Sequence, residues 1–321
     1  YDRALSLAGP ANDTPDSFPL LWGLWLGSSS WADHDVSLDL AHRLKRLAPL
    51  RTGDPFARGH AHYALGNSLL SRGEFAAAAA TLEAGLDGHP TNTNLSPYGE
   101  DAAVTNLAML SWARWFLGRN DAALDAANRA VERARSLEHP YTTGYALILS
   151  AILHRLMGNA AAVRRYAEEA HRLSHEHDLA LWIAASQAML GWARAAAGDP
   201  AGLAELLDSA NRVKDIAGGI ETMFLAQLVD ACERLDAWPQ ALEATELGLS
   251  IGQAKRDRHY EAEFLRIKAL AIAASGGRDA SDLLRQADQV ARKQGAVALS
   301  RRIAASAARL SSTGQQSVGL G

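Results

Sequence analysis

The sequence predicts an all-α fold, a right-handed α-solenoid of about seven helix pairs with an incomplete N-terminal repeat and a C-terminal closing helix. Turn-forming residues recur with a period of about 40 residues, and the segments between them are rich in Ala and poor in Pro, which favours helix. No segment alternates apolar and polar residues over the length of a strand. A chain of 321 residues is also near the size limit of a single round core, whereas stacked repeats bury their surfaces against their neighbours.

The helix pairs can be placed by the residue at the turn inside each pair. Successive turns are 41, 45, 40, 40, 38 and 40 residues apart. The largest spacing places an inserted loop at residues 89–100, where Pro, Asn, Ser and Gly are frequent. The predicted turn residues, in chain order, are Ala32, Gly73, Gly118, Gly158, Gly198, Asp236 and Gly276.

The clearest unit runs from His62 to Pro90. In this unit Gly66 allows two helices to approach closely, Gly73 ends the first helix with a left-handed cap, and Ala78 fits beneath the neighbouring helix. These residue types at these offsets resemble the tetratricopeptide repeat (TPR). A period near 40 exceeds the 34 residues of the common TPR unit, which predicts longer second helices.

The two ends complete the predicted organisation. Residues 1–15 match the second helix of a repeat whose first helix is missing, and we expect further chain before Tyr1 to cover the apolar face. The closing helix is expected to carry Arg301, Arg302 and Arg309 on its solvent side. We predict a TPR-like domain over 1–310 (half repeat 1–15, seven repeats plus closing helix 17–310, inserted loop 89–100) and a disordered tail over 311–321.

Several stretches resemble the C-terminal TPR region of bacterial STAND-type signal-transduction ATPases, which couple a P-loop ATPase to a transcription-regulating or nucleotide-cyclase domain. The similar stretches are 18–25, 98–101, 261–268 and 291–310, whereas the sequence departs from the family at 28–33. The resemblance implies a sensor or partner-binding region that regulates the ATPase and contacts the N-terminal domains of a longer chain.

Composition and charge exclude several classes of function. Acidic residues outnumber basic residues by 36 to 32, and a net charge of −4 disfavours direct binding to nucleic acid or to an anionic membrane. No apolar stretch reaches the length of a membrane span. The single cysteine, Cys232, cannot form an internal disulfide, which fits a reducing compartment, so we expect a cytoplasmic protein.

Candidate chemistry is sparse. The sequence lacks the phosphate-binding loop G-x-x-x-x-G-K-[ST], so we expect no ATP hydrolysis by this chain. His171 and His175 are spaced to share a metal on one helix face, although histidines near a helix C-terminus also interact favourably with the dipole. Cys232 is more typical of a small buried residue than of a nucleophile. The sequence therefore predicts no catalytic residue, no metal site and no cofactor.

The stronger signal is the placement of aromatic and charged residues on the first helix of each pair. In TPR units the second, fifth, ninth, twelfth and thirteenth residues of that helix face the concave groove, and the resemblance implies the same here. Trp and Arg are frequent binding anchors; the alternative is that the large rings fill gaps between Ala-rich helices. The predicted groove residues are Trp22, Tyr63, Asn67, Trp112, Trp115, Phe116, Tyr145, Arg155, Trp192, Asp230, Glu233 and Arg266.

The function expected from the sequence is non-catalytic recognition. A protein or peptide segment, or a small effector, would bind in the groove and favour one curvature of the superhelix. Two alternatives remain open: a scaffold that mediates self-association, giving a homo-oligomer, and an enzyme with a metal or hydrolytic site hidden in the groove around His171 and His175.

Overall fold

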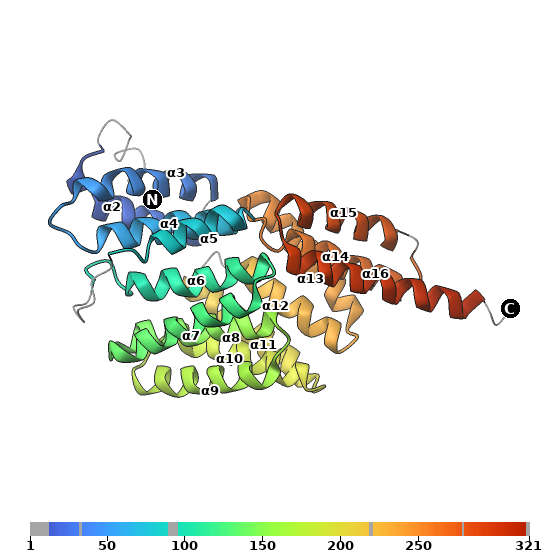
Figure 1. Ribbon diagram of the computed structural model, residues 1–321. Helices are drawn as coiled ribbons and strands as arrows, with labels where there is room; N and C mark the ends of the chain where they lie inside the picture. Colours follow the sequence, from blue (N-terminus) through green and yellow to red (C-terminus); the bar gives the residue numbers. More distant parts are fainter. Residues whose placement is uncertain (1–12, 32–33, 89–95, 218–220, 278, 319–321) are drawn as a thin grey trace.

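Within the residues that it describes, a computed structural model of the protein contains seven consecutive helix pairs followed by one further helix (Figure 1). The structure describes residues 13–31, 34–88, 96–217, 221–277 and 279–318, and within these ranges it contains helices and no strand. The pairs are α2 (Phe18–Trp31) with α3 (His34–Leu47), α4 (Ala57–Ser71) with α5 (Phe75–Ala84), α6 (Ala102–Phe116) with α7 (Asn120–Ser136), α8 (Pro140–Leu156) with α9 (Ala160–Glu176), α10 (Ala180–Ala196) with α11 (Ala201–Ala217), α12 (Glu221–Arg234) with α13 (Trp238–Lys255), and α14 (Glu261–Ala274) with α15 (Ala280–Lys293). Helix α16 (Val297–Val318) follows, and the short 3-10 helices η2 (Pro15–Ser17) and η3 (Ala48–Leu50) flank the first pair.

The turns inside the pairs lie where the sequence placed them. Every predicted turn residue that the structure describes adopts a left-handed backbone conformation, with φ between 51° at Asp236 and 89° at Gly198. Such a conformation ends a helix and turns the chain at little steric cost when the residue is Gly. The first predicted turn residue, Ala32, lies outside the described residues. These turns and the continuous helix-on-helix packing confirm the predicted α-solenoid.

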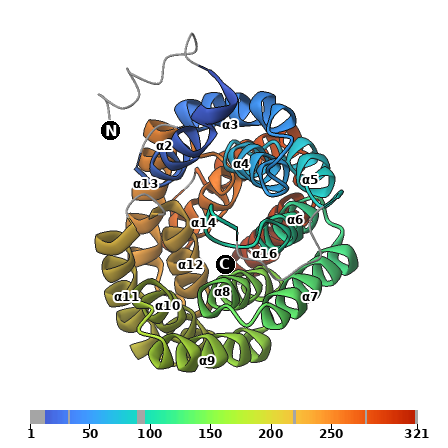
Figure 2. The ribbon, with the colours of Figure 1, turned by 90° about the vertical axis from the view of Figure 1, so that its left-hand side faces the viewer.

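The helices form two concentric layers. The first helices of the pairs line the inside of the superhelix, and the second helices form its outer wall (Figure 2). Small residues allow the layers to pack closely: a Cβ atom on Gly191 of α10 would lie 2.9 Å from the carbonyl oxygen of Gly202 on α11. The Ala-rich faces of the outer helices, such as Ala123 and Ala130 of α7, are completely buried.

The superhelix coils back until its last pairs touch its first. Arg258 and His259, in the turn between α13 and α14, donate their backbone N–H groups to the carbonyl of Ser71 at the end of α4, at 2.7 and 3.2 Å. The side chain of Gln294 donates to the carbonyl of Arg258 at 2.8 Å. This contact joins the C-terminal end of α4 to the turn before α14.

The structure describes little of the predicted half repeat at the N-terminus, and its last helix extends past the predicted C-terminal limit of the domain. Of the predicted half repeat, only residues 13–15 are described, and there Asp13 pairs with Arg43 at 2.6 Å. Helix α16 continues to Val318, so the predicted boundary at residue 310 falls inside the helix. Ser311 extends the helical hydrogen bonding by donating its hydroxyl to the carbonyl of Ala307 at 3.0 Å.

No helix among the described residues combines the length and the apolar character that are needed to cross a membrane.

Candidate binding surface inside the superhelix

All predicted groove residues lie on the first helix of a pair and therefore belong to the inner layer. The structure buries most of them; Asn67 and Glu233 are half-buried. We describe them in three groups, the last two of which are linked by Arg302. An N-terminal group contains Trp22, Tyr63, Asn67 and Tyr145, a middle group contains Trp112, Trp115 and Phe116, and a C-terminal group contains Arg155, Trp192, Asp230, Glu233 and Arg266.

The N-terminal group is closed by the end of the inserted loop. Trp22 donates its indole N–H to the carbonyl of Tyr98 at 3.0 Å. The hydroxyls of Tyr63 and Tyr145 lie 3.4 Å apart, and burial raises the pKa of both tyrosines above the usual value. Burial also raises the pKa of Glu100 beside them. The polar atoms of these rings thus already have partners within the protein.

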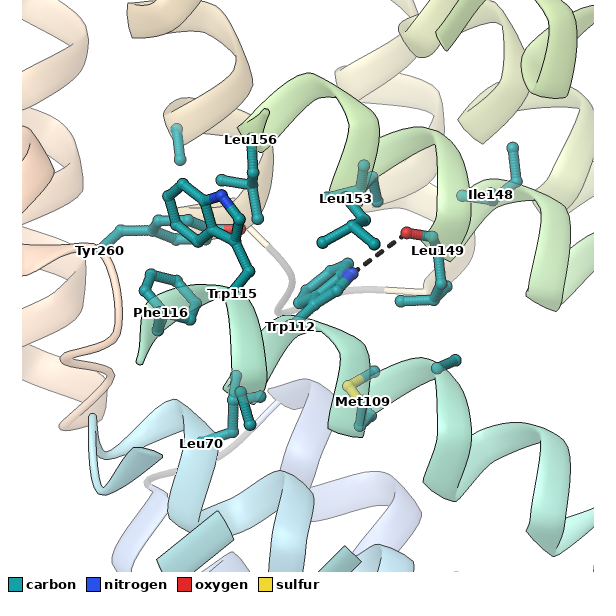
Figure 3. Packing of buried hydrophobic residues seen from close by; sticks show 14 of the residues in the cluster. Leu70, Met109, Trp112, Trp115, Phe116, Ile148, Leu149, Leu153, Leu156 and Tyr260 are labelled. Atoms are coloured by element: carbon teal, nitrogen blue, oxygen red, sulfur yellow. Dashed lines mark hydrogen bonds between the residues drawn. The ribbon is translucent and has the colours of Figure 1, made fainter. Parts of the chain in front are cut away.

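The residues of the middle group lie on α6 and pack against α5, α8 and α16 (Figure 3). Trp112 donates its indole N–H to the carbonyl of Leu149 on α8 at 3.1 Å. Phe116 stacks on Phe75 with a centroid distance of 4.1 Å. The guanidinium of Arg302 on α16 lies over the Trp115 ring at 5.2 Å. These contacts join three successive pairs and the closing helix, and the predicted role of the rings in binding remains a prediction.

Part of the C-terminal group lines an open hollow of about 500 Å3 between α12, α14 and α16, which we call the charged hollow. Asp230, Glu233 and Arg266, three of the predicted groove residues, line it together. The remaining residues that line the charged hollow are Arg234, Arg302, Ala305, Ser306 and Arg309.

Ion pairs tie the walls of the charged hollow together. Arg266 binds Glu263 on its own helix at 2.8 Å and Glu233 on α12 at 2.5 Å. From α16, Arg302 reaches Glu263 at 2.7 Å and Arg309 reaches Glu233 at 2.9 Å. Burial by itself would raise the pKa of Glu263, but Arg266 and Arg302 outweigh it and lower the pKa to about 2. Glu263 is therefore ionised at neutral pH.

Trp192 lies directly behind this wall. Its indole N–H donates to the Asp230 carboxylate at 2.7 Å, and the same carboxylate accepts from Arg234 at 3.1 Å. The Arg234 guanidinium also lies over the Trp192 ring at 4.8 Å. One aromatic side chain and two opposite charges are thus held in a single arrangement by α10 and α12.

Arg155, the remaining predicted residue, extends from the end of α8 to α12. Its Nη1 donates to the carbonyl of Ala226 at 3.3 Å, one turn before Asp230. Arg302 donates to the carbonyl of Leu156, the next residue along α8. Arg155 therefore lies close to the charged hollow although it does not line it.

The histidines of the alternative metal or hydrolytic site lie outside the inner layer. His171 and His175 have ring centroids 4.5 Å apart, but both belong to α9 in the outer layer, so a site around them would not lie in the groove. In the part of the chain that the structure describes, no group of three or more His, Cys, Asp or Glu side chains could hold a metal ion. Cys232 is fully buried, and burial raises the pKa of its thiol to about 12, which disfavours the reactive thiolate.

Five of the eight residues that line the charged hollow were not among the predicted groove residues. Arg302 was expected on the solvent side of the closing helix; it is instead largely covered by Trp115, Glu263 and the end of α8. The spacing of Glu263 with Arg266 and of Asp230 with Arg234, at i+3 and i+4, could have indicated paired charges on one helix face. The face of α16 that contacts the inner helices could not be predicted from residue spacing, because it depends on how far the superhelix turns.

Comparisons with known proteins support the fold. No family model matches the chain. An uncharacterized protein of Rhizobium meliloti (strain 1021) is 22% identical over 317 residues, and the match covers 94% of this chain but 30% of that protein. The chain thus spans less than a third of the length of this relative.

Among solved structures, the chain resembles a Rap protein complexed with Competence and Sporulation Factor, with a TM-score of 0.52 and 13% identity over 85% of this chain and 81% of that one. The apo form of RapI gives a TM-score of 0.46 and 15% identity over 82% of this chain and 99% of that one. Rap proteins are TPR-like helical repeat proteins, so the first likeness agrees with the solenoid fold described above.

Proposed function

We propose that this chain is a non-catalytic recognition domain that binds a polypeptide segment on the inner surface of its superhelix, at the charged hollow. The observation that carries the proposal is the hollow itself, about 500 Å3 in volume and lined by charged side chains from three helices. Ion pairs at a solvent-accessible rim contribute little to stability, so they can exchange partners with a ligand at low cost. Arg309, whose side chain is 60% exposed, is such a rim group.

The position of the hollow suggests how binding could act on the rest of the protein. Helices α12, α14 and α16 belong to the sixth pair, the seventh pair and the closing helix. A ligand that bridges them favours the superhelical curvature in which its contacts are best, by no more than its difference in affinity between the curvatures. Binding would thereby be communicated to whatever contacts the solenoid.

The wider context of the proposal rests on the sequence resemblance. We propose that the domain is the regulatory sensor region of a longer, ATPase-linked signalling or transcription-regulating protein. The Rap protein of similar fold was solved in complex with Competence and Sporulation Factor, and partner binding is therefore the first activity to test here. The purified chain itself is expected to show no saturable ATP hydrolysis.

The test is selection of binding peptides from a displayed random peptide library, followed by fluorescence anisotropy with the enriched peptides. Arg309→Ala should weaken binding at least fivefold, because the peptide loses a charged contact at the rim. Arg301→Ala is the matched control, since Arg301 is exposed on the same helix but does not line the hollow. Failure to enrich any peptide, or equal binding by both variants, would count against the proposal. Size-exclusion chromatography with light scattering tests the self-association alternative.

A further inference from the structure

We infer that the charged hollow and the buried Arg155 beneath it form a binding site for a carboxylate group, so that the preferred partner is an acidic peptide. This inference rests on the proposed function and specifies the ligand of the same site. Two observations carry it: the balance of charge around the hollow, and a buried guanidinium whose carboxylate-binding edge faces no carboxylate among the described residues.

The charge around the hollow is opposite in sign to that of the whole protein. Three carboxylates, those of Asp230, Glu233 and Glu263, are gathered at the hollow or directly behind it. Five guanidinium groups lie at the hollow or close to it, and a fourth carboxylate, that of Asp257, acts on the neighbouring Tyr260, so the site carries an excess of one positive charge within a chain of net charge −4. An anionic ligand would therefore be attracted to this part of the inner surface. The five arginines are Arg155, Arg234, Arg266, Arg302 and Arg309.

Arg155 is one of these five arginines and is almost completely buried, with 1% of its surface exposed. Its Nη1 donates to the Ala226 carbonyl, while its Nε and Nη2 have no hydrogen-bond partner among the described residues. The Tyr260 hydroxyl lies beside the Arg155 guanidinium, which partly offsets the rise that burial causes in the pKa of Tyr260, and it too makes no hydrogen bond of good geometry among the described residues. A buried charge without a partner opposes folding, so its presence calls for a group that neutralises it.

The unpartnered atoms identify that group. Nε and Nη2 form the edge of a guanidinium that donates two parallel hydrogen bonds to one carboxylate. Elsewhere in this chain the same edge is used in this way: Nε and Nη2 of Arg133 bind the two oxygens of Asp101 at 2.8 and 2.7 Å. Arg266 binds Glu263 through the same two atoms at 2.9 and 2.8 Å. Among the described residues, no carboxylate binds the equivalent edge of Arg155.

The location of Arg155 connects this edge to the hollow. Ala226, which Arg155 contacts, lies one helical turn before Asp230 on α12. On α16, Arg302 lines the hollow and also donates to the Leu156 carbonyl beside Arg155. Because Nε and Nη2 of Arg155 are inaccessible in this structure, a ligand carboxylate in the hollow would have to displace a neighbouring side chain such as Arg302 to reach them, and the Tyr260 hydroxyl could then donate to it as well.

The experiment measures binding of a fluorescein-labelled hexaglutamate peptide by fluorescence anisotropy at low salt, with hexaglutamine as the uncharged comparison. We expect hexaglutamate to bind at least tenfold more tightly. Arg155→Met should weaken hexaglutamate binding at least tenfold, since hydrogen bonds to charged groups are lost. Arg164→Met is the matched control on the outer helix α9, where the side chain is exposed, and should bind like the wild type.

Thermal unfolding distinguishes a ligand-binding Arg155 from one that only stabilises the fold. Without peptide, Arg155→Met should keep or raise the Tm, because an unpaired buried charge is replaced by an apolar chain of similar length. Hexaglutamate should raise the Tm of the wild type and not that of the variant. Tyr260→Phe provides a second, milder variant, which should fold normally and bind hexaglutamate several-fold more weakly.

Several results would overturn the inference. A lower Tm of Arg155→Met together with unchanged hexaglutamate binding would show that Arg155 serves the fold alone. Equal binding of hexaglutamine would remove the role of the carboxylate, and stronger competition by inorganic phosphate than by succinate would assign the site to a phosphate group. If library peptides without acidic residues bind at Arg309, the proposed function stands and this inference fails.

Discussion

Trp192 donates its indole N–H to the carboxylate of Asp230 at 2.7 Å, and this bond joins the inner helices of the fifth and sixth pairs. Both residues were predicted to face a common groove, and they are indeed neighbours. Their polar atoms, however, are directed at each other and at Arg234. The pair therefore supports the wall of the charged hollow, and any ligand contact would be made by the groups that it holds in place.

The coupling between these two residues can be measured in a double-mutant cycle. Asp230→Ala should lower the free energy of unfolding by about 1–3 kcal/mol, because the indole N–H and Arg234 both lose an acceptor. Trp192→Phe should cost less when Asp230 is already absent, with a coupling energy of about 1 kcal/mol or more. Urea unfolding followed by circular dichroism gives each value. Strictly additive effects would show that the bond contributes nothing.

The Trp112 ring tests whether the aromatic residues of the middle group pack or bind. It is 3% exposed and its N–H has an internal acceptor. Trp112→Ala should therefore lower the free energy of unfolding by about 3–5 kcal/mol, as expected for a large buried ring. Trp238→Ala is the control, because this ring is only half-buried at the start of α13. A cost for Trp112→Ala as small as that of the control would favour a binding role.

Closure of the superhelix can be tested at two turn glycines with the same backbone conformation. Gly118 and Gly276 both have φ of 77°, but a Cβ atom on Gly118 would lie 2.8 Å from Cγ1 of Val297 on α16, whereas one on Gly276 would meet nothing within 4 Å. Each Ala substitution should cost about 1 kcal/mol for the left-handed backbone. Gly118→Ala should cost about 1–3 kcal/mol more because of the clash. Equal losses of Tm would show that α16 does not rest on this turn in solution.

Acid should weaken the wall of the charged hollow through Glu263. Burial disfavours the charged form, but Arg266 and Arg302 dominate and hold the pKa near 2, below the usual 4.5, with Glu233 sharing Arg266. A pKa lowered by folding gives stability that is present above the unfolded value and is lost as the pH falls from about 4.5 to about 2. Glu263→Gln should have a lower Tm at pH 7 and a flatter decline in acid. Parallel curves for the variant and the wild type would contradict this assignment.

Much of the architecture was predictable because it is encoded locally. A left-handed turn residue, an Ala-rich helix and the next turn interact within one unit, so the turns from Gly73 to Gly276 could be placed from residue type and spacing. The same spacing assigned every predicted groove residue to an inner helix. What spacing could not reveal was whether an inner position faces an open surface or a neighbouring helix.

The sequence by itself determined the helix pairs, their turns and the division into inner and outer helices, since these depend on contacts between residues close in the chain. Only the tertiary structure decided how far the superhelix turns, because small rotations between successive units add up over the whole array. That sum brings Arg302 onto the carbonyl of Leu156, 146 residues earlier, rather than into solvent. It also leaves the edge of Arg155 buried beside the charged hollow without a carboxylate among the described residues.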